Sequence, residues 1–198
     1  TDRVSQSDPT HSPIASRPDW RPAQGKPGSS LDAMKAQALD RFGVSHGICN
    51  PLCGVQMVFS EDMADAFCRA LNDWLAREWL DRDTRLRGSI VIPVQSVEKS
   101  VAEIERCAAD KRFVQVLMLV MGDMPLGKRA YWPIYAAAER LGLPIGIHAG
   151  SNYHNPPTSV GWGSYHIEDY VAQAQAFQTQ LTSLIVEGVF ARHPNLKM

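Results

Sequence analysis

Short apolar segments alternate with amphipathic helical patterns along most of the chain, and this alternation restricts the possible folds more than any other feature. The apolar segments lie at Ser45–Cys49, Ser89–Ile92, Phe113–Val120 and Pro144–His148. They are apolar on both faces, which is typical of parallel strands covered by helices. We therefore predict four parallel strands that are adjacent in chain order, with a helix between each strand and the next.

Capping and stop signals locate the helices between these strands. Ser60, followed by Glu61 and Asp62, has the pattern of a helix N-cap with acidic residues in the first turn. The apolar stripe expected for that helix consists of Met63, Phe67, Ala70, Trp74 and Leu75. Further helices are predicted at Asp32–Asp40, from Val97 to Ala108, at Tyr131–Leu141 before the stop signal Gly142, and from about Ile167 to Phe190.

The predicted fold class is α/β, a (β/α)8 TIM-barrel type of which about the middle four to five β/α units are present. A closed barrel of this type takes about 250 residues, and this chain has 198. A fifth strand would begin at Leu196–Met198, and the first residue is Thr1 rather than Met, so we expect a partial chain. The alternative, a doubly wound sheet, needs a G-x-G-x-x-G turn after a strand, and the sequence has none.

Two regions of different composition divide the chain. Residues 1–30 hold five prolines and few apolar residues, so we predict a Pro/Gly-rich arm or a disordered segment, with Trp20 as its one anchoring residue. Residues 31–198 form the predicted partial barrel domain. Of the four cysteines, Cys68 and Cys107 lie within apolar helical patterns and are expected to be buried, reduced thiols.

Charge and hydropathy limit the partners. The formal net charge is −1 without a basic stripe, which argues against nucleic acid. No apolar run approaches the roughly 20 residues that cross a bilayer, and the first residues lack a signal-peptide pattern, so we expect a cytoplasmic protein that does not bind membranes. A partial barrel leaves strand edges open. We therefore expect a homo-oligomer, or further segments that complete the barrel, and a small molecule as the substrate.

Candidate site residues follow from the fold, because β/α proteins place their working residues at the carboxyl ends of strands. This rule selects Asn50, Gln95, Met121 and His148. His148 ends an apolar strand beside the small residues Ala149 and Gly150, and a histidine there is either a metal ligand or a structural residue bonded to the backbone. Two residues of the following loop, His154 and Trp162, join Asn50, Gln95 and Met121 as predicted substrate-binding residues. His46 and His193 lie at the non-catalytic ends of strands and are predicted to be structural.

Two stretches resemble a known family. The segment WPIYAAAERLGLPIGIHAG at residues 132–150 resembles the helix–strand unit of amidohydrolase-2 proteins, which include decarboxylases related to aminocarboxymuconate-semialdehyde decarboxylase. The segment GVFARHPNLK at residues 188–197 resembles the link into that family's next strand. The resemblance implies a metal-dependent hydrolase or decarboxylase that acts on a small carboxylated or amide-like substrate.

The same resemblance implies a divalent metal, with zinc the expected ion. In that family the ligands are a His-x-His or similar pair after the first strand, a histidine that ends the fifth strand, and an aspartate near the last strand. His148 matches the fifth-strand histidine, whereas the pair, the late aspartate and the family's acid–base residue after the sixth strand have no counterpart in this sequence. The alternative function is therefore a non-catalytic β/α scaffold or assembly subunit without a metal site.

Overall fold

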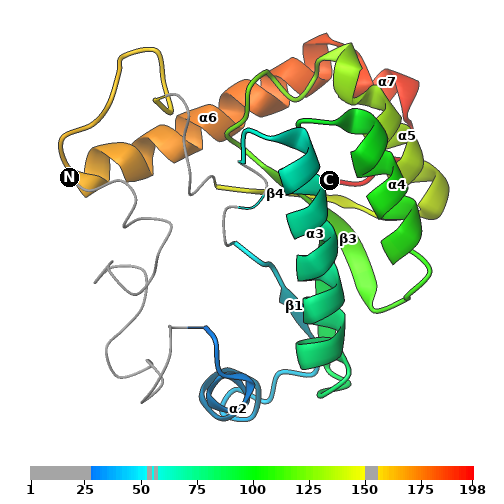
Figure 1. The fold of residues 1–198 in the computed structure, drawn as a ribbon. Helices are drawn as coiled ribbons and strands as arrows, with labels where there is room; N and C mark the ends of the chain where they lie inside the picture. Colours follow the sequence, from blue (N-terminus) through cyan, green and yellow to red (C-terminus); the bar gives the residue numbers. More distant parts are fainter. Residues whose placement is uncertain (1–27, 53–54, 56–57, 150–155) are drawn as a thin grey trace.

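A sheet of four parallel strands forms the centre of the molecule (Figure 1). The computed structural model describes residues 28–52, 55, 58–149 and 156–198, so the predicted arm with Trp20, and also His154, lie outside the described residues. The strands pair in the order β1-β2-β3-β4, and each pair is parallel. They are β1 (Gly47–Cys49), β2 (Leu86–Val91), β3 (Phe113–Leu119) and β4 (Ile145–His148). The prediction of four parallel strands in chain order is confirmed.

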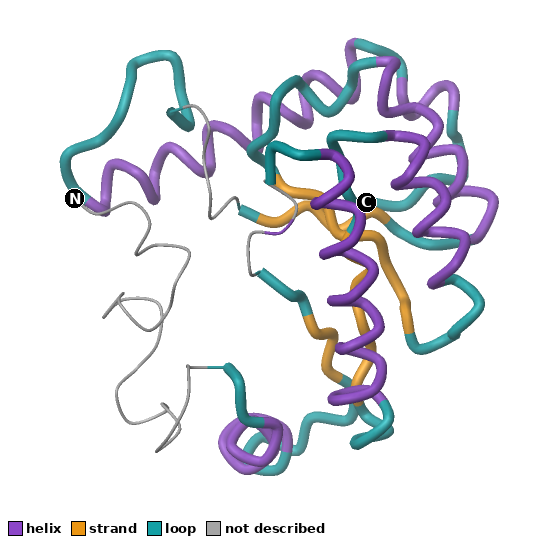
Figure 2. The backbone as a smooth tube through the Cα atoms, in the orientation of Figure 1, coloured by secondary structure: helices purple, strands orange, loops and turns teal. Residues whose placement is uncertain are grey.

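Helices follow the strands as the alternation predicts. They are α2 (Leu31–Met34) with the π-helical turn η2 (Lys35–Leu39), α3 (Glu61–Leu75) with η4 (Ala76–Leu80), α4 (Val97–Cys107), η5 (Arg129–Tyr131), α5 (Trp132–Leu141), α6 (His166–Val186) and α7 (Val189–Arg192). Helices α3, α4 and α5 lie side by side along one face of the sheet (Figure 2). None of the helices in the described part of the chain is both long enough and apolar enough to span a membrane.

The core lies between the sheet and these helices. Val116 and Met118 of β3 are buried there together with Ile104 of α4 and Ile134 of α5. Because side chains alternate along a strand, Gln115 and Leu117 point to the opposite face, which we call the inner face because it would line the inside of a barrel. The chain also returns to the free edge of β4, where the Ile145 amide donates to the Lys197 carbonyl oxygen at 2.9 Å. This hydrogen bond lies where the sequence predicts a fifth strand to begin, and the four strands with their helices are half of a (β/α)8 barrel.

Two helix predictions are wrong in part. Ser60 caps α3 as expected, but Met63, Phe67 and Trp74 are 51%, 45% and 40% exposed. The buried positions of α3 are Ala64, Cys68, Asn72 and Leu75, so only Leu75 of the predicted stripe packs inward. The helix presents Ala64, Cys68, Asn72 and Leu75 to the sheet, and Met63, Phe67 and Trp74 lie outward.

The helix predicted from Ile167 to Phe190 is two helices. Helix α6 ends at Val186, and Gly188 adopts the left-handed conformation with φ of +81° before α7 begins. Glycine reaches this conformation without steric cost, so it stops the helix although the apolar pattern continues. The expectation for Cys68 and Cys107 is confirmed, since both are buried thiols.

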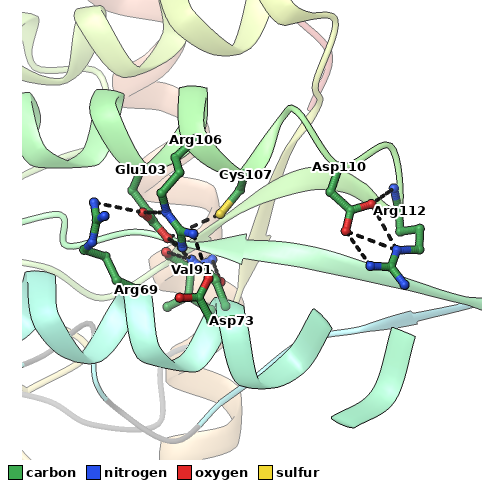
Figure 3. A network of polar contacts seen from close by, with 9 residues as sticks. Arg69, Asp73, Val91, Glu103, Arg106, Cys107, Asp110 and Arg112 are labelled. Atoms are coloured by element: carbon green, nitrogen blue, oxygen red, sulfur yellow. Dashed lines mark hydrogen bonds and ion pairs between the residues drawn. The ribbon is translucent and has the colours of Figure 1, made fainter. Parts of the chain in front are cut away.

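A buried polar network joins α3, β2 and α4 (Figure 3). The Asn72 amide nitrogen donates to Glu103 Oε1 at 2.7 Å, and Arg106 donates to both oxygens of the same carboxylate at 2.7 and 2.8 Å. Cys107 Sγ donates to Glu103 Oε1 at 3.3 Å. Burial by itself raises the pKa of Glu103, but these hydrogen bonds outweigh it and the pKa is lowered. The carboxylate is therefore held in its ionised form between the two helices.

The loops at the amino ends of β2 and β3 share one arrangement. Asp83 accepts from the backbone nitrogen and the guanidinium of Arg85, whose Nη1 also donates to Asp40 at the end of η2, at 2.7 Å. Asp110 and Arg112 repeat this before β3, and Arg112 Nη1 reaches Asp81 at the end of η4 at 2.5 Å. Each arginine therefore ties the entry of its own strand to the end of the helix that precedes the neighbouring strand. This edge is built for stability, which leaves the opposite edge for chemistry.

Candidate active site

The carboxyl ends of the four strands meet at one edge of the sheet, where the sequence predicts the site. Asn50 directly follows β1, and His148 is the last residue of β4. Gln95 lies in the loop after β2 and Met121 in the loop after β3. The structure therefore brings these four residues to the same edge, although their roles as ligands or substrate contacts stay predictions.

The His148 ring has one hydrogen bond within the described residues. Its Nδ1 lies 2.7 Å from the carbonyl oxygen of Ala149. A carbonyl oxygen only accepts, so Nδ1 must carry the hydrogen, and in the neutral ring the lone pair is then on Nε2. Metal-bound histidines commonly have this arrangement, with the other ring nitrogen donating to a carbonyl or carboxylate. The side chain thus fits the role of a metal ligand through Nε2. The same hydrogen bond also agrees with the alternative, a structural histidine bonded to the backbone.

The described residues supply only part of a metal site. Among them no group of three or more His, Cys, Asp or Glu side chains is close enough to hold an ion. A catalytic zinc site needs about three protein donors and a water. The residues in the described ranges therefore do not fit a complete metal site by themselves, and His148 is the candidate donor that ends a strand at this edge.

Three polar side chains form a connected cluster on the inner face. Ser89 Oγ donates to Asn50 Oδ1 at 2.5 Å, and Gln115 Nε2 donates to Ser89 Oγ at 2.8 Å and to Asn50 Oδ1 at 3.2 Å. Ser89 and Gln115 pair directly in the register of β2 and β3. Sequence reasoning missed both because they lie inside strands rather than after them. The one available signal was a glutamine in the middle of an otherwise apolar strand.

Gly146 connects this cluster to His148. A Cβ atom on Gly146 would lie 3.0 Å from Gln115 Nε2 and 3.1 Å from Gln115 Cδ, so the carboxamide rests directly against the bare backbone of β4. Gly146 and His148 are two residues apart on β4 and therefore on the same face of the sheet. At about 3.3 Å per residue they are separated by roughly 7 Å along the strand.

Gln95 binds a neighbouring loop. Its Nε2 donates to the Val58 carbonyl oxygen at 2.6 Å, which fastens the loop after β2 to the loop after β1. Within that region Val91 and Leu117 are buried against Leu52 and Val55. Gln95 therefore shapes the edge by holding a loop, and substrate contact by its side chain stays a prediction.

Met121 lines a cleft of about 650 Å³ between the loop after β3, residues 156–159 and helix α6. Gln180 of α6 fixes that loop, because its amide nitrogen donates to the Val120 carbonyl oxygen and its oxygen accepts from Leu126, both at 2.7 Å. Val120 in turn donates to the carbonyl oxygen of His148 at 2.8 Å. Trp162 is 41% exposed and does not line the cleft, so the structure does not bring it together with Met121.

At the opposite edge, His193 lies where the sequence predicts a structural histidine. It is buried, and its Nδ1 is 3.1 Å from Glu139 Oε2, while Glu139 Oε1 accepts from the Asn195 backbone nitrogen at 2.8 Å. The hydrogen bond from Asn195 and the one from His193 lower the pKa of Glu139 despite partial desolvation. This pair holds the segment that leads from α7 to the predicted fifth strand, and it lies away from the candidate site.

Comparisons with known proteins agree with this architecture. The family model described as amidohydrolase matches residues 7–198. The gamma-resorcylate decarboxylase of Rhodococcus jostii is 26% identical over 193 residues, which cover 87% of this chain and 59% of that protein. The crystal structure of 2,6-dihydroxybenzoate decarboxylase from Rhizobium aligns with a TM-score of 0.67 at 25% identity, covering 82% of this chain and 53% of that one.

A third similar protein has lower identity. The dihydroxybenzoic acid decarboxylase of Polaromonas sp. JS666, solved with bound manganese and the inhibitor 2-nitroresorcinol, aligns with a TM-score of 0.61 at 23% identity and covers 82% of this chain and 52% of that one. The chain spans about half the length of the curated relatives it matches, between 46% and 59% for the first two. The family match over nearly the whole sequence, together with the parallel half-barrel, shows that this chain belongs to the amidohydrolase family.

Proposed function

We propose that these residues form the central part of a metal-dependent enzyme that decarboxylates a small carboxylated substrate. The observation that carries the proposal is His148, which ends β4 at the catalytic edge with Nδ1 donating to Ala149 and Nε2 available to a metal. Decarboxylation is preferred to hydrolysis because the curated relatives at 25–26% identity are named gamma-resorcylate decarboxylases. Activity, substrate and partners of the whole protein belong to this proposal, since the chain covers only part of each relative.

His148 would hold a divalent cation together with donors from outside the described residues. When bound, such an ion supplies a positive charge that orients and polarises a substrate carboxylate or carbonyl. The Polaromonas structure with bound manganese supports a divalent ion but does not favour zinc, so the proposal leaves the identity of the ion open. The residues of this chain hold the imidazole in place, through Ala149, and form one wall of the site.

The non-catalytic scaffold, the alternative from the sequence, has no observation in its favour. The strand-end histidine is retained with its hydrogen bond, and the relatives in the family are enzymes by name. A homo-oligomeric state and a cytoplasmic location stay predictions.

The test is a reaction assay on the full-length protein that carries these residues. The protein is loaded with Mn²⁺ or Zn²⁺ and incubated with 2,6-dihydroxybenzoate and with a panel of aromatic amides and esters. Release of CO₂ is followed in parallel with amide and ester cleavage. We expect metal-dependent CO₂ release and no cleavage of the panel. Metal-dependent cleavage of an amide or ester without CO₂ release would show that the reaction is hydrolysis and not decarboxylation. A metal-loaded protein that is inactive on every compound would support the non-catalytic scaffold.

A further inference from the structure

We infer that Gln115, held by Ser89 and Asn50, forms a neutral subsite that binds a hydroxyl or carboxamide substituent of the substrate. The inference rests on the proposed function, because it places the reacting carboxylate at His148. It adds two residues, Gln115 and Ser89, that the strand-end rule did not select.

The cluster occupies a place where barrels normally have apolar side chains. The inner face of a (β/α)8 barrel is filled mainly by Val, Ile and Leu, as it is here at Val91 and Leu117. Polar groups in such a place are costly unless they are hydrogen-bonded. Within the described residues, the three hydrogen bonds of the cluster use one nitrogen of Gln115 and one oxygen of Asn50. The Gln115 oxygen and the Asn50 amide nitrogen stay available to a ligand.

The cluster lies at the distance from His148 that one small ring spans. Gln115 rests against Gly146, which precedes His148 by two residues on the same face of β4, or roughly 7 Å along the strand. A six-membered ring with its carboxylate at the His148 end would extend a ring substituent toward the Gln115 carboxamide. Gly146 allows this close approach, because a Cβ there would lie 3.0 Å from the amide nitrogen and push the carboxamide back.

The subsite selects a neutral group. Its three side chains carry no charge, so a substrate carboxylate would gain no ion pair there. The nearest cation along β2 is Arg87, whose Nη1 donates to the carbonyl oxygens of Thr84 and Leu86 at 2.9 and 2.8 Å. A phenolic hydroxyl or a carboxamide both donates and accepts, and it therefore matches the oxygen of Gln115 and the amide nitrogen of Asn50.

The experiment measures binding of resorcinol, a neutral diol without a carboxylate, to the full-length protein after removal of metal. Gln115→Met keeps the length of the side chain and removes its hydrogen-bonding groups, and Gln178→Met on the exposed face of α6 is the matched control. Titration calorimetry should show binding that is weakened up to about tenfold in Gln115→Met, the size expected for a lost neutral hydrogen bond at a half-buried side chain. Gln178→Met should bind as the unmodified protein does. Gly146→Ala is a second variant with the glutamine intact, and it should weaken resorcinol binding by displacing the carboxamide.

Equal resorcinol binding in the unmodified protein and in both Gln115→Met and Gly146→Ala, or no binding to the unmodified protein, would overturn the inference. These outcomes are separate from a failure of the proposed function. Resorcinol binding that depends on Gln115, in a protein without decarboxylase activity, would support the subsite and contradict the proposed reaction. Decarboxylation and resorcinol binding that are both unchanged in Gln115→Met would support the proposed reaction and contradict the subsite.

Discussion

Asn72 of helix α3 binds both backbone groups of Val91 at the end of β2. Its amide nitrogen donates to the Val91 carbonyl oxygen at 2.8 Å, and its Oδ1 accepts from the Val91 nitrogen at 3.0 Å. The same nitrogen donates to the buried carboxylate of Glu103. One side chain therefore completes the hydrogen bonding of the strand end and links it to α4, next to the edge that holds the candidate site.

Replacement of Asn72 should lower the stability strongly. Asn72→Ala leaves the buried Val91 backbone groups and one bond of Glu103 without a partner, so we expect a loss of about 2–4 kcal/mol in the free energy of unfolding. Asn195→Ala is the control, because Asn195 is exposed and the bond it makes to Glu139 is from its backbone nitrogen, which the substitution keeps. Urea unfolding followed by circular dichroism measures both variants. A loss no larger than that of the control would show that the network does not support the strand end.

Glu103 makes the stability depend on pH in a stated direction. Its hydrogen bonds to Arg106, Asn72 and Cys107 lower its pKa from 4.5 against the opposing effect of burial. A carboxyl group whose pKa is lower in the folded state than in the unfolded state stabilises the fold at pH values above its unfolded-state pKa. This contribution is lost as the pH falls through the folded-state pKa. The advantage of the unmodified protein over Glu103→Gln should therefore be full at pH 7 and shrink as the pH falls below 4.5.

Urea midpoints at a series of pH values check this expectation. Glu105→Gln on the same helix is the control, since Glu105 is 49% exposed and pairs with the exposed Arg140. An advantage over Glu103→Gln that stays constant from neutral to acid pH would contradict the lowered pKa.

Two glycines in the loop after β3 offer a matched pair of variants. A Cβ on Gly127 would lie 2.2 Å from the backbone oxygen of Ser183 in α6, whereas a Cβ on Gly122 would meet nothing within 4 Å. Gly127→Ala must therefore separate the loop from the helix, and we expect a loss of about 2–3 kcal/mol, in the range of overpacked core substitutions. Gly122→Ala should change the free energy of unfolding by no more than about 0.5 kcal/mol, because the added methyl group meets no neighbouring atom. Thermal unfolding of the two variants measures the difference, and equal melting temperatures would mean that the loop and α6 are not in close contact.

The sequence predicts the strands well because their pattern depends on local composition. Apolar segments such as Phe113–Val120 are buried on both faces in any β/α fold, and the observed strand Phe113–Leu119 differs from the prediction by one residue. The face of α3 is not determined in this way. A large apolar side chain such as Trp74 can pack inward or lie outward. In this helix Asn72 faces the sheet instead, where it hydrogen-bonds to Val91, and that contact is evident only from the structure.

The site residues that directly follow or end a strand could be predicted from the sequence, whereas those brought together by the pairing of neighbouring strands could not. His148 and Asn50 end strands, and the rule finds them from the sequence. The cluster that joins Asn50 to Gln115 depends on the register of three strands and on the bare backbone of Gly146, neither of which a local pattern contains. The family resemblance of residues 132–150 and 188–197 is confirmed, and it was the stronger indication of function.

The most direct test of the account is the metal content of the full-length protein with His148→Ala. His148 is a small strand-end side chain bonded only to Ala149 among the described residues, so the variant should fold as the unmodified protein does. His46→Ala is the matched control, because His46 is exposed and precedes β1 at the opposite edge. After dialysis against Mn²⁺ or Zn²⁺, elemental analysis should give about one ion per chain for the unmodified protein and for His46→Ala. His148→Ala should retain less than about a tenth of that amount, since one lost ligand of about three removes most of the affinity. A folded His148→Ala protein with full metal content would contradict the ligand assignment and leave His148 a structural residue.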